Sequence, residues 1–276
     1  MRGRGFGAIV ALPQSERREV ALAIRIRVVT PITTEGFRTP ADAAPLESDD
    51  VKVSFVNIDT GPASIECDYE IMLAQPGTIA KIVEAERQGA DAVVIDCMGD
   101  PGLFGARECV SIPVLGPMQT AMGVAAMMGH KFSVVTVLSR ILPMIETQAA
   151  VYGMTSKLAS ARSIEIPVLE LEKDLAATKR ALIAEARKAV VEDGADYIIF
   201  GCTGMLGCAE AVHEGLLKEG FNVPVIDPVP TAINIAAALV RSRLSHSKQA
   251  YRPPPRKNIV GYAAIGIGAQ SREAAE

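Results

Sequence analysis

The sequence predicts an α/β protein with two pseudo-symmetric lobes, each a parallel sheet flanked by helices, and an active site in the cleft between them. Three observations lead to this prediction. A nine-residue frame occurs twice, short apolar segments alternate with segments of helical periodicity, and the apolar residues are mainly aliphatic. Hydrophobic residues make up 49% of the 276 residues but aromatic residues only 4%, a composition that suits buried parallel strands covered by helices.

The internal repeat is the strongest of the three observations. GADAVVIDC, residues 89–97, and GADYIIFGC, residues 194–202, share one frame at a spacing of 105 residues. A second matched pair follows each frame, SIPVLGPMQTAMGVAA from Ser111 and NVPVIDPVPTAINIAA from Asn222. A weaker pair, RIRVVT and KFSVVT, precedes each frame. Self-similarity at nearly constant spacing indicates two copies of one α/β unit.

The elements of each unit follow from local patterns. One helix is predicted from an N-cap at Thr78 to the glycine at Gly89, and another from about Asp174 to Glu192, ended by Gly194. Runs rich in Val and Ile, bounded by turn residues, predict strands at residues 25–30, 51–58, 92–96 and 197–200. In parallel sheets the loops after the strands gather at one edge. We therefore expect both frame-ending cysteines at that edge.

The repeat also predicts the domain boundaries. Residues 24–117 together with 228–262 are expected to form the first lobe, because the helix after Pro228 returns to it. Residues 118–227 form the second lobe. Residues 1–23 are interpreted as an N-terminal extension, since their short apolar run lacks a convincing cleavage site, and residues 263–276 as a C-terminal tail.

Charge and cysteine content narrow the function classes. The 28 basic and 32 acidic residues are interspersed, which argues against nucleic acid or a membrane surface as partner. No segment approaches the roughly 20 apolar residues of a spanning helix. Five cysteines without a CxxC pair or a histidine cluster favour free thiols in a reducing cytoplasm, with no metal. We therefore predict that the protein acts on a small-molecule substrate.

The two frame-ending cysteines, Cys97 and Cys202, are the predicted catalytic pair. Inverting a carbon next to a carbonyl requires one group to remove a proton from one face while another delivers a proton to the opposite face. A thiol, with a reference pKa of about 8.5, can serve in either role. The turns after them contain Gly99 and Gly204, whose backbone can approach a ligand closely. We expect the amide groups of these turns to lower both thiol pKa values.

For the other residues that could take part in chemistry, the sequence gives weaker support for a functional role. Cys67, Cys109 and Cys208 are interpreted as packing residues, since free cysteine is commonly buried. Asp100 is interpreted first as a turn or N-cap residue and second as a group that tunes Cys97. The three histidines lie in polar contexts, so the sequence indicates no histidine base.

At these residues the chain resembles the hydantoin and allantoin racemase branch of the aspartate/glutamate racemase superfamily. ACxGDPGL-like and GCxGM-like segments are typical of that branch, and this chain has IDCMGDPGL and FGCTGM. TGPASIECDYE and SKQAYRPPPRKNIVG are similar to further segments, so the resemblance covers about residues 25–262. It implies two lobes, catalysis by Cys97 and Cys202, no metal or pyridoxal cofactor, and a homo-oligomer. The turns containing Met98, Gly99, Asp100, Thr203 and Gly204 would then contact substrate.

The first loop departs from the family pattern. Where that pattern has a segment like NPNTS, this chain has Thr30-Pro31-Ile32-Thr33-Thr34. Thr30 and Ile32 are therefore predicted to line the pocket, and Ile32 predicts a less polar wall. This favours 5-substituted hydantoins or another cyclic substrate over polar allantoin.

Several alternatives remain at this stage. An amino-acid racemase, a maleate isomerase and an arylmalonate decarboxylase are all similar in scaffold. The decarboxylases resemble the pattern with one cysteine only, and amino-acid racemases have Cys-Asn-Thr or Cys-Thr-His segments where this chain has Cys-Met-Gly and Cys-Thr-Gly. A two-lobed solute-binding protein is a rival from another class, and turnover as opposed to binding alone distinguishes it.

Overall fold

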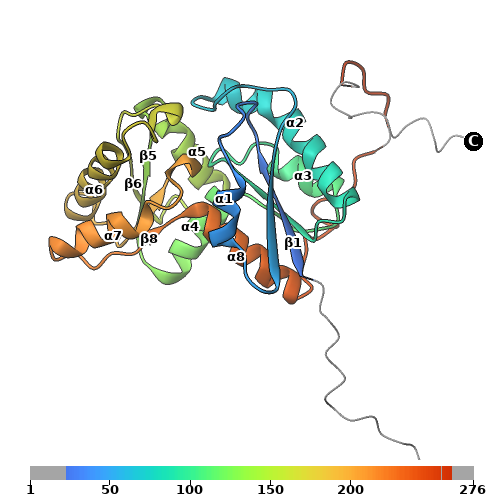
Figure 1. Ribbon diagram of the computed structural model, residues 1–276. Coiled ribbons are helices and arrows are strands. Elements are labelled where there is room, and N and C mark those ends of the chain that lie inside the picture. Colours follow the sequence, from blue (N-terminus) through green and yellow to red (C-terminus); the bar gives the residue numbers. More distant parts are fainter. Residues whose placement is uncertain (1–22, 256, 263–276) are drawn as a thin grey trace, which may run out of the picture.

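The computed structural model describes residues 23–255 and 257–262, and these residues form two α/β halves that lie side by side (Figure 1). One half contains a four-stranded sheet in the order β2-β1-β3-β4, and the other a four-stranded sheet in the order β6-β5-β7-β8. Every strand pairing within these sheets is parallel. The predicted fold class is thereby confirmed.

The strands of the first sheet are β1 (Ile24–Thr30), β2 (Val51–Asn57), β3 (Ala92–Ile95) and β4 (Val114–Leu115). Those of the second are β5 (Phe132–Thr136), β6 (Leu158–Ser163), β7 (Tyr197–Phe200) and β8 (Val225–Ile226). The helices are α1 (Pro40–Ala43), α2 (Asp68–Arg87), α3 (Leu103–Cys109), α4 (Pro117–Met128), α5 (Leu142–Val151), α6 (Leu175–Val191), α7 (Ala209–Lys218) and α8 (Pro228–Arg241).

Strand register reproduces the sequence repeat. Ile26 of β1 pairs with Ala92 of β3, and Phe132 of β5 pairs with Tyr197 of β7. The two pairs are thus separated by 106 and 105 residues along the chain, the spacing of the repeated frames. Equivalent residues of the two copies therefore occupy equivalent places at the carboxyl ends of the two sheets.

Alternation along β1 and β3 explains how the first sheet is covered on both faces. Ile26 and Val94 point to one face, where they pack against Ala232 and Ile233 of α8. Other side chains of the same strands, Val29 and Ile95 among them, pack against α2 and α3. Because both faces are buried, these strands are apolar at nearly every position, as parallel strands usually are. Helix α8 thus packs on the first sheet although it follows the second.

The two long helices differ in how well their ends were predicted. Helix α6 begins after Asp174, whose carboxylate accepts a hydrogen bond from the Ala177 amide at 2.8 Å, and the chain turns at Gly194 with φ +72°, as predicted. The N-cap at Thr78 was wrong, because α2 already begins at Asp68 and continues through Pro76. A proline removes one hydrogen bond, but buried residues on both sides of it hold this helix together.

The predicted N-terminal extension, apart from Ala23, and the predicted C-terminal tail lie outside the described residues. Within the part of the chain that the structure describes, no helix combines the length and apolarity needed to cross a membrane.

Candidate active site

A cavity lies between the two halves at the carboxyl ends of the strands. The space there, including the open solvent at its mouth, amounts to about 520 Å³. Cys97 follows β3, Cys202 follows β7, and both line this cavity. The repeat therefore places one half-buried thiol from each half of the molecule in a single space.

The turn after each cysteine has the same local structure. The Gly99 amide donates a hydrogen bond to Cys97 Sγ at 3.4 Å, and the Gly204 amide donates one to Cys202 Sγ at 3.4 Å. A Cβ atom at Gly99 would lie 2.8 Å from Ile71 Cδ1, and one at Gly204 would lie 2.9 Å from Leu171 Cδ1. A side chain at either position would therefore have to displace the end of a neighbouring aliphatic side chain.

The prediction that these turns lower both thiol pKa values was wrong in its net result. Burial raises the pKa of Cys202 to about 11, although the Gly204 amide and the positive charge of Arg38 act in the opposite direction. Burial also raises the pKa of Cys97, more than the Gly99 amide lowers it. Removing a thiolate from water outweighs a single amide hydrogen bond here.

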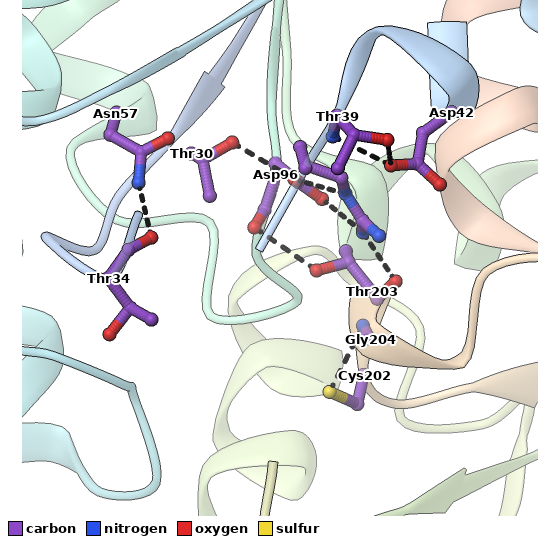
Figure 2. A network of polar contacts seen from close by, with 10 residues as sticks. Thr30, Thr34, Thr39, Asp42, Asn57, Asp96, Cys202, Thr203 and Gly204 are labelled. Carbon is purple, nitrogen blue, oxygen red and sulfur yellow. Dashed lines mark hydrogen bonds and ion pairs between the residues drawn. The ribbon is translucent and has the colours of Figure 1, made fainter. Parts of the chain in front are cut away.

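A buried ion pair that sequence patterns did not indicate lies beside the thiols. Arg38 donates to both carboxylate oxygens of Asp96, at 2.8 and 3.0 Å, and also to the Thr203 carbonyl at 2.6 Å. The Thr203 hydroxyl in turn donates to the backbone carbonyl of Asp96 at 3.1 Å. Figure 2 shows Asp96, Thr203 and Cys202 together in this network. Arg38 lies in a loop without periodicity and is far from Asp96 along the chain. No sequence pattern therefore marks the two residues as a pair.

Further hydrogen bonds connect the two halves around the cavity. Glu66 accepts from the Val168 amide at 2.8 Å, and Gln148 donates to the Met98 carbonyl at 2.9 Å. Together with the contact between Arg38 and Thr203, they join the loops of the first sheet to those of the second.

The predicted substrate-binding residues divide into two groups. Ile32, Met98, Gly99 and Thr203 line the cavity. Thr30, Asp100 and Gly204 are not among the lining residues. Thr30 is buried and donates to Asp96 Oδ2 at 3.1 Å, while Gly204 contributes its amide to Cys202 as described above.

Asp100 has a structural position that accounts for its burial. Its carboxylate accepts hydrogen bonds from the amides of Met118 and Gln119, in the first turn of α4, and from the Tyr152 hydroxyl at 2.7 Å. It therefore caps α4 from outside that helix, a variant of the predicted N-cap role. Burial raises the pKa of Asp100 to about 6.

The remaining walls of the cavity are mainly apolar. Phe37 and Ile65 come from the first half, and a larger group from the second half consists of Val137, Ile141, Met144 and Val168. Cys67 also lines the cavity, which places it in the site and not in the core as its packing interpretation implied. Among the described residues, no group of three or more His, Cys, Asp or Glu side chains is arranged to hold a metal ion.

Comparison with known proteins gives one consistent result. Residues 26–236 match the Asp/Glu/hydantoin racemase family. The chain is 37% identical to the hydantoin racemase of Pseudomonas sp. (strain NS671), over 86% of this chain and 95% of that protein. It is 36% identical to the hydantoin racemase of Rhizobium meliloti, over 87% of this chain and 98% of that protein.

Solved structures agree with these sequence matches. The allantoin racemase from Klebsiella pneumoniae superposes with a TM-score of 0.82 at 32% identity, covering 88% of this chain and 99% of that chain. Unliganded arylmalonate decarboxylase superposes with a TM-score of 0.56 at 18% identity, over 86% of this chain and 96% of that chain, and so shares the fold.

Fold, site and comparisons together define the class of protein as a two-lobed α/β racemase, which is an isomerase. The chain belongs to the Asp/Glu/hydantoin racemase family.

Proposed function

We propose that this enzyme racemises 5-substituted hydantoins or related cyclic ureides by moving protons between Cys97, Cys202 and the two faces of one substrate carbon, without a cofactor. The observation that carries this proposal is the presence of equivalent cysteines from the two repeats in one cavity. Each can be supported in its charged form by the amide of the glycine two residues later. One thiolate removes the proton, and the thiol on the other side returns one.

The apolar lining of the cavity supports a substrate with an apolar substituent. Hydantoin offers ring N–H and C=O groups that the polar loops can bind, while the substituent needs a wall. That wall contains Ile32, Phe37 and Met144, which offer no hydrogen bond to a ureido group. Allantoin is the second candidate, supported by the structural similarity to allantoin racemases.

A circular-dichroism assay on pure enantiomers distinguishes these candidates. We expect 5-isobutyl- and 5-benzylhydantoin to lose their signal with a kcat/KM at least about tenfold above that for allantoin, because burying apolar groups in an apolar pocket discriminates by this order. Ile32→Asn should reduce that preference about tenfold. Equal turnover of allantoin and the apolar hydantoins would reject the apolar specificity, and no turnover of either would reject the proposed function.

Activity is expected to depend steeply on pH. Because the pKa of Cys202 is raised to about 11, its thiolate is a minor species near neutrality. Below that pKa, the fraction of thiolate increases about tenfold for each unit by which the pH rises. After subtraction of the uncatalysed rate, kcat/KM should rise about tenfold per unit between pH 7 and 9, since this parameter reports the free enzyme. A plateau already reached at pH 7 would contradict this prediction.

We infer a reducing cytoplasm as the place of action and a homo-oligomer as the assembly. The cytoplasm is supported by five free cysteines, two of which must remain reduced for the proposed chemistry. The oligomer is supported by the family resemblance. Light scattering on the purified chain tests the second inference, and a monomer at micromolar concentration would refute it.

A further inference from the structure

The ion pair between Arg38 and Asp96 is unusual because both charged groups are almost fully buried. Their side chains are 3% and 0% exposed, respectively. Charged residues are rarely buried to this extent, because removing them from water opposes folding unless they are paired and fully hydrogen-bonded. Here the guanidinium forms a bidentate contact and a third bond to the Thr203 carbonyl. This arrangement is pre-organised, and it lies beside the two thiols.

The ion pair also breaks the pseudo-symmetry of the site. Asp96 directly precedes Cys97, whereas the equivalent residue before Cys202 is Gly201, which has no side chain. Arg38 reaches across to Thr203, the residue directly after Cys202. The negative end of the pair is therefore joined to the Cys97 turn, and its positive end contacts the Cys202 turn.

We propose that Arg38 is a positioning residue that makes Cys202, and not Cys97, the first thiol to lose its proton in the resting enzyme. This inference rests on the proposed function, because it assigns unequal starting roles to the two proposed acid and base groups. Arg38 acts through its charge and through the bond that holds the Thr203 carbonyl, and it needs no contact with substrate.

The charged groups around the two thiols differ in one respect, which is the presence of Arg38 beside Cys202. Around Cys202, the charge of Arg38 lowers the thiol pKa, while Asp96 and Glu66 raise it. Around Cys97, the neighbouring Cys202, Asp100 and Asp96 all raise the pKa. A negative charge is therefore more stable on Cys202.

Alkylation by iodoacetamide, followed for each cysteine by mass spectrometry, tests this proposal without any substrate. Thiolate is the reacting form, so the rates report relative acidity. In the wild-type enzyme at pH 8.5, Cys202 should react at least about tenfold faster than Cys97, which corresponds to one pKa unit. The exposed Cys109 serves as an internal reference for the reagent.

The single variants Arg38→Met and Asp96→Asn distinguish an effect of charge on Cys202 from a loosening of the site. Arg38→Met should slow alkylation of Cys202 about tenfold, whereas Asp96→Asn, which leaves the cation in place, should accelerate it about tenfold. Arg38→Lys retains the charge and should remain within about threefold of wild type. A structural disturbance alone would instead accelerate both thiols in both variants, because it admits reagent and water.

The double variant Arg38→Met/Asp96→Asn covers the case in which a single variant fails to fold, since it leaves neither charge buried without a partner. Its ratio of Cys202 to Cys97 rates should lie between those of the two single variants. Faster reaction at Cys97 in the wild type would overturn the proposal, as would a folded double variant whose ratio is no lower than that of Asp96→Asn. Failure of the hydantoin assay would instead overturn the proposed function, while leaving these alkylation rates interpretable.

Discussion

Replacing either Cys97 or Cys202 by serine is expected to abolish racemisation. Both steps of the reaction need a group that can gain and lose a proton near neutrality, and a serine hydroxyl is far too weak a base without an activating partner. General acid–base groups typically contribute factors of about 10² to 10⁴, so each variant should lose at least about a hundredfold in kcat/KM.

Proton exchange need not be lost with racemisation. With one thiolate remaining, each serine variant should still exchange the substrate's α-hydrogen in heavy water for one enantiomer, with retention of configuration. The two variants should prefer opposite enantiomers, because each remaining sulfur faces one side of the carbon. Proton NMR on each pure enantiomer measures this exchange.

Cys109→Ser is the matched control, because Cys109 is exposed and does not line the cavity. It should racemise at the wild-type rate. Electrostatic coupling between the two thiols is expected to shift the pKa of the remaining one in each active-site variant, so the exchange should be followed from pH 7 to 10. Racemisation at a near wild-type rate by either active-site variant would exclude that cysteine as a catalytic group.

Asp100→Ala is expected to have the largest effect on stability. The substitution removes the acceptor of three hydrogen bonds, leaves the buried Met118 amide and the half-buried Gln119 amide without this partner, and places alanine at φ +46°. Bonds to a charged group contribute about 1.5 to 3 kcal/mol each but are not additive. We expect the free energy of unfolding to fall by about 3 kcal/mol and Tm by roughly 6 to 12 °C.

Urea denaturation of two milder variants identifies the cause. Tyr152→Phe removes a single bond to Asp100 and should reduce the free energy of unfolding by about 1 kcal/mol. Asp100→Asn keeps a side chain that tolerates positive φ and should lie between the other two variants. If Asp100→Ala reduced the free energy of unfolding by less than about 1 kcal/mol, capping of α4 would not be a significant contribution of this residue.

Sequence patterns predicted the elements that depend on short-range residue patterns or on the internal repeat. The strand after Gly194 and the helix begun by Asp174 follow from turn, cap and periodicity, and the repeat placed Cys97 and Cys202 at equivalent strand ends. The start of α2 was missed because Thr78, which follows Gly77, fits a local N-cap pattern, although both residues lie inside a helix that begins at Asp68.

The parts of the site that escaped prediction depend on contacts between distant segments. Arg38 pairs with a residue 58 positions away and reaches one 165 positions away, and no periodicity or motif marks such a pair. The thiol pKa values were expected to fall because the amide groups of the turns are visible in the sequence. The depth of burial, which reverses the direction, is a property of the assembled cavity.

Racemisation of one pure hydantoin enantiomer in heavy water, stopped at low conversion, tests the two-thiol mechanism most directly. If protons are removed on one face and delivered on the other, the newly formed enantiomer should carry deuterium at the α-carbon while the recovered starting enantiomer retains its hydrogen. A starting enantiomer that acquires deuterium as fast as the product forms would show that one group serves both faces, and would contradict the assignment of Cys97 and Cys202 as a pair.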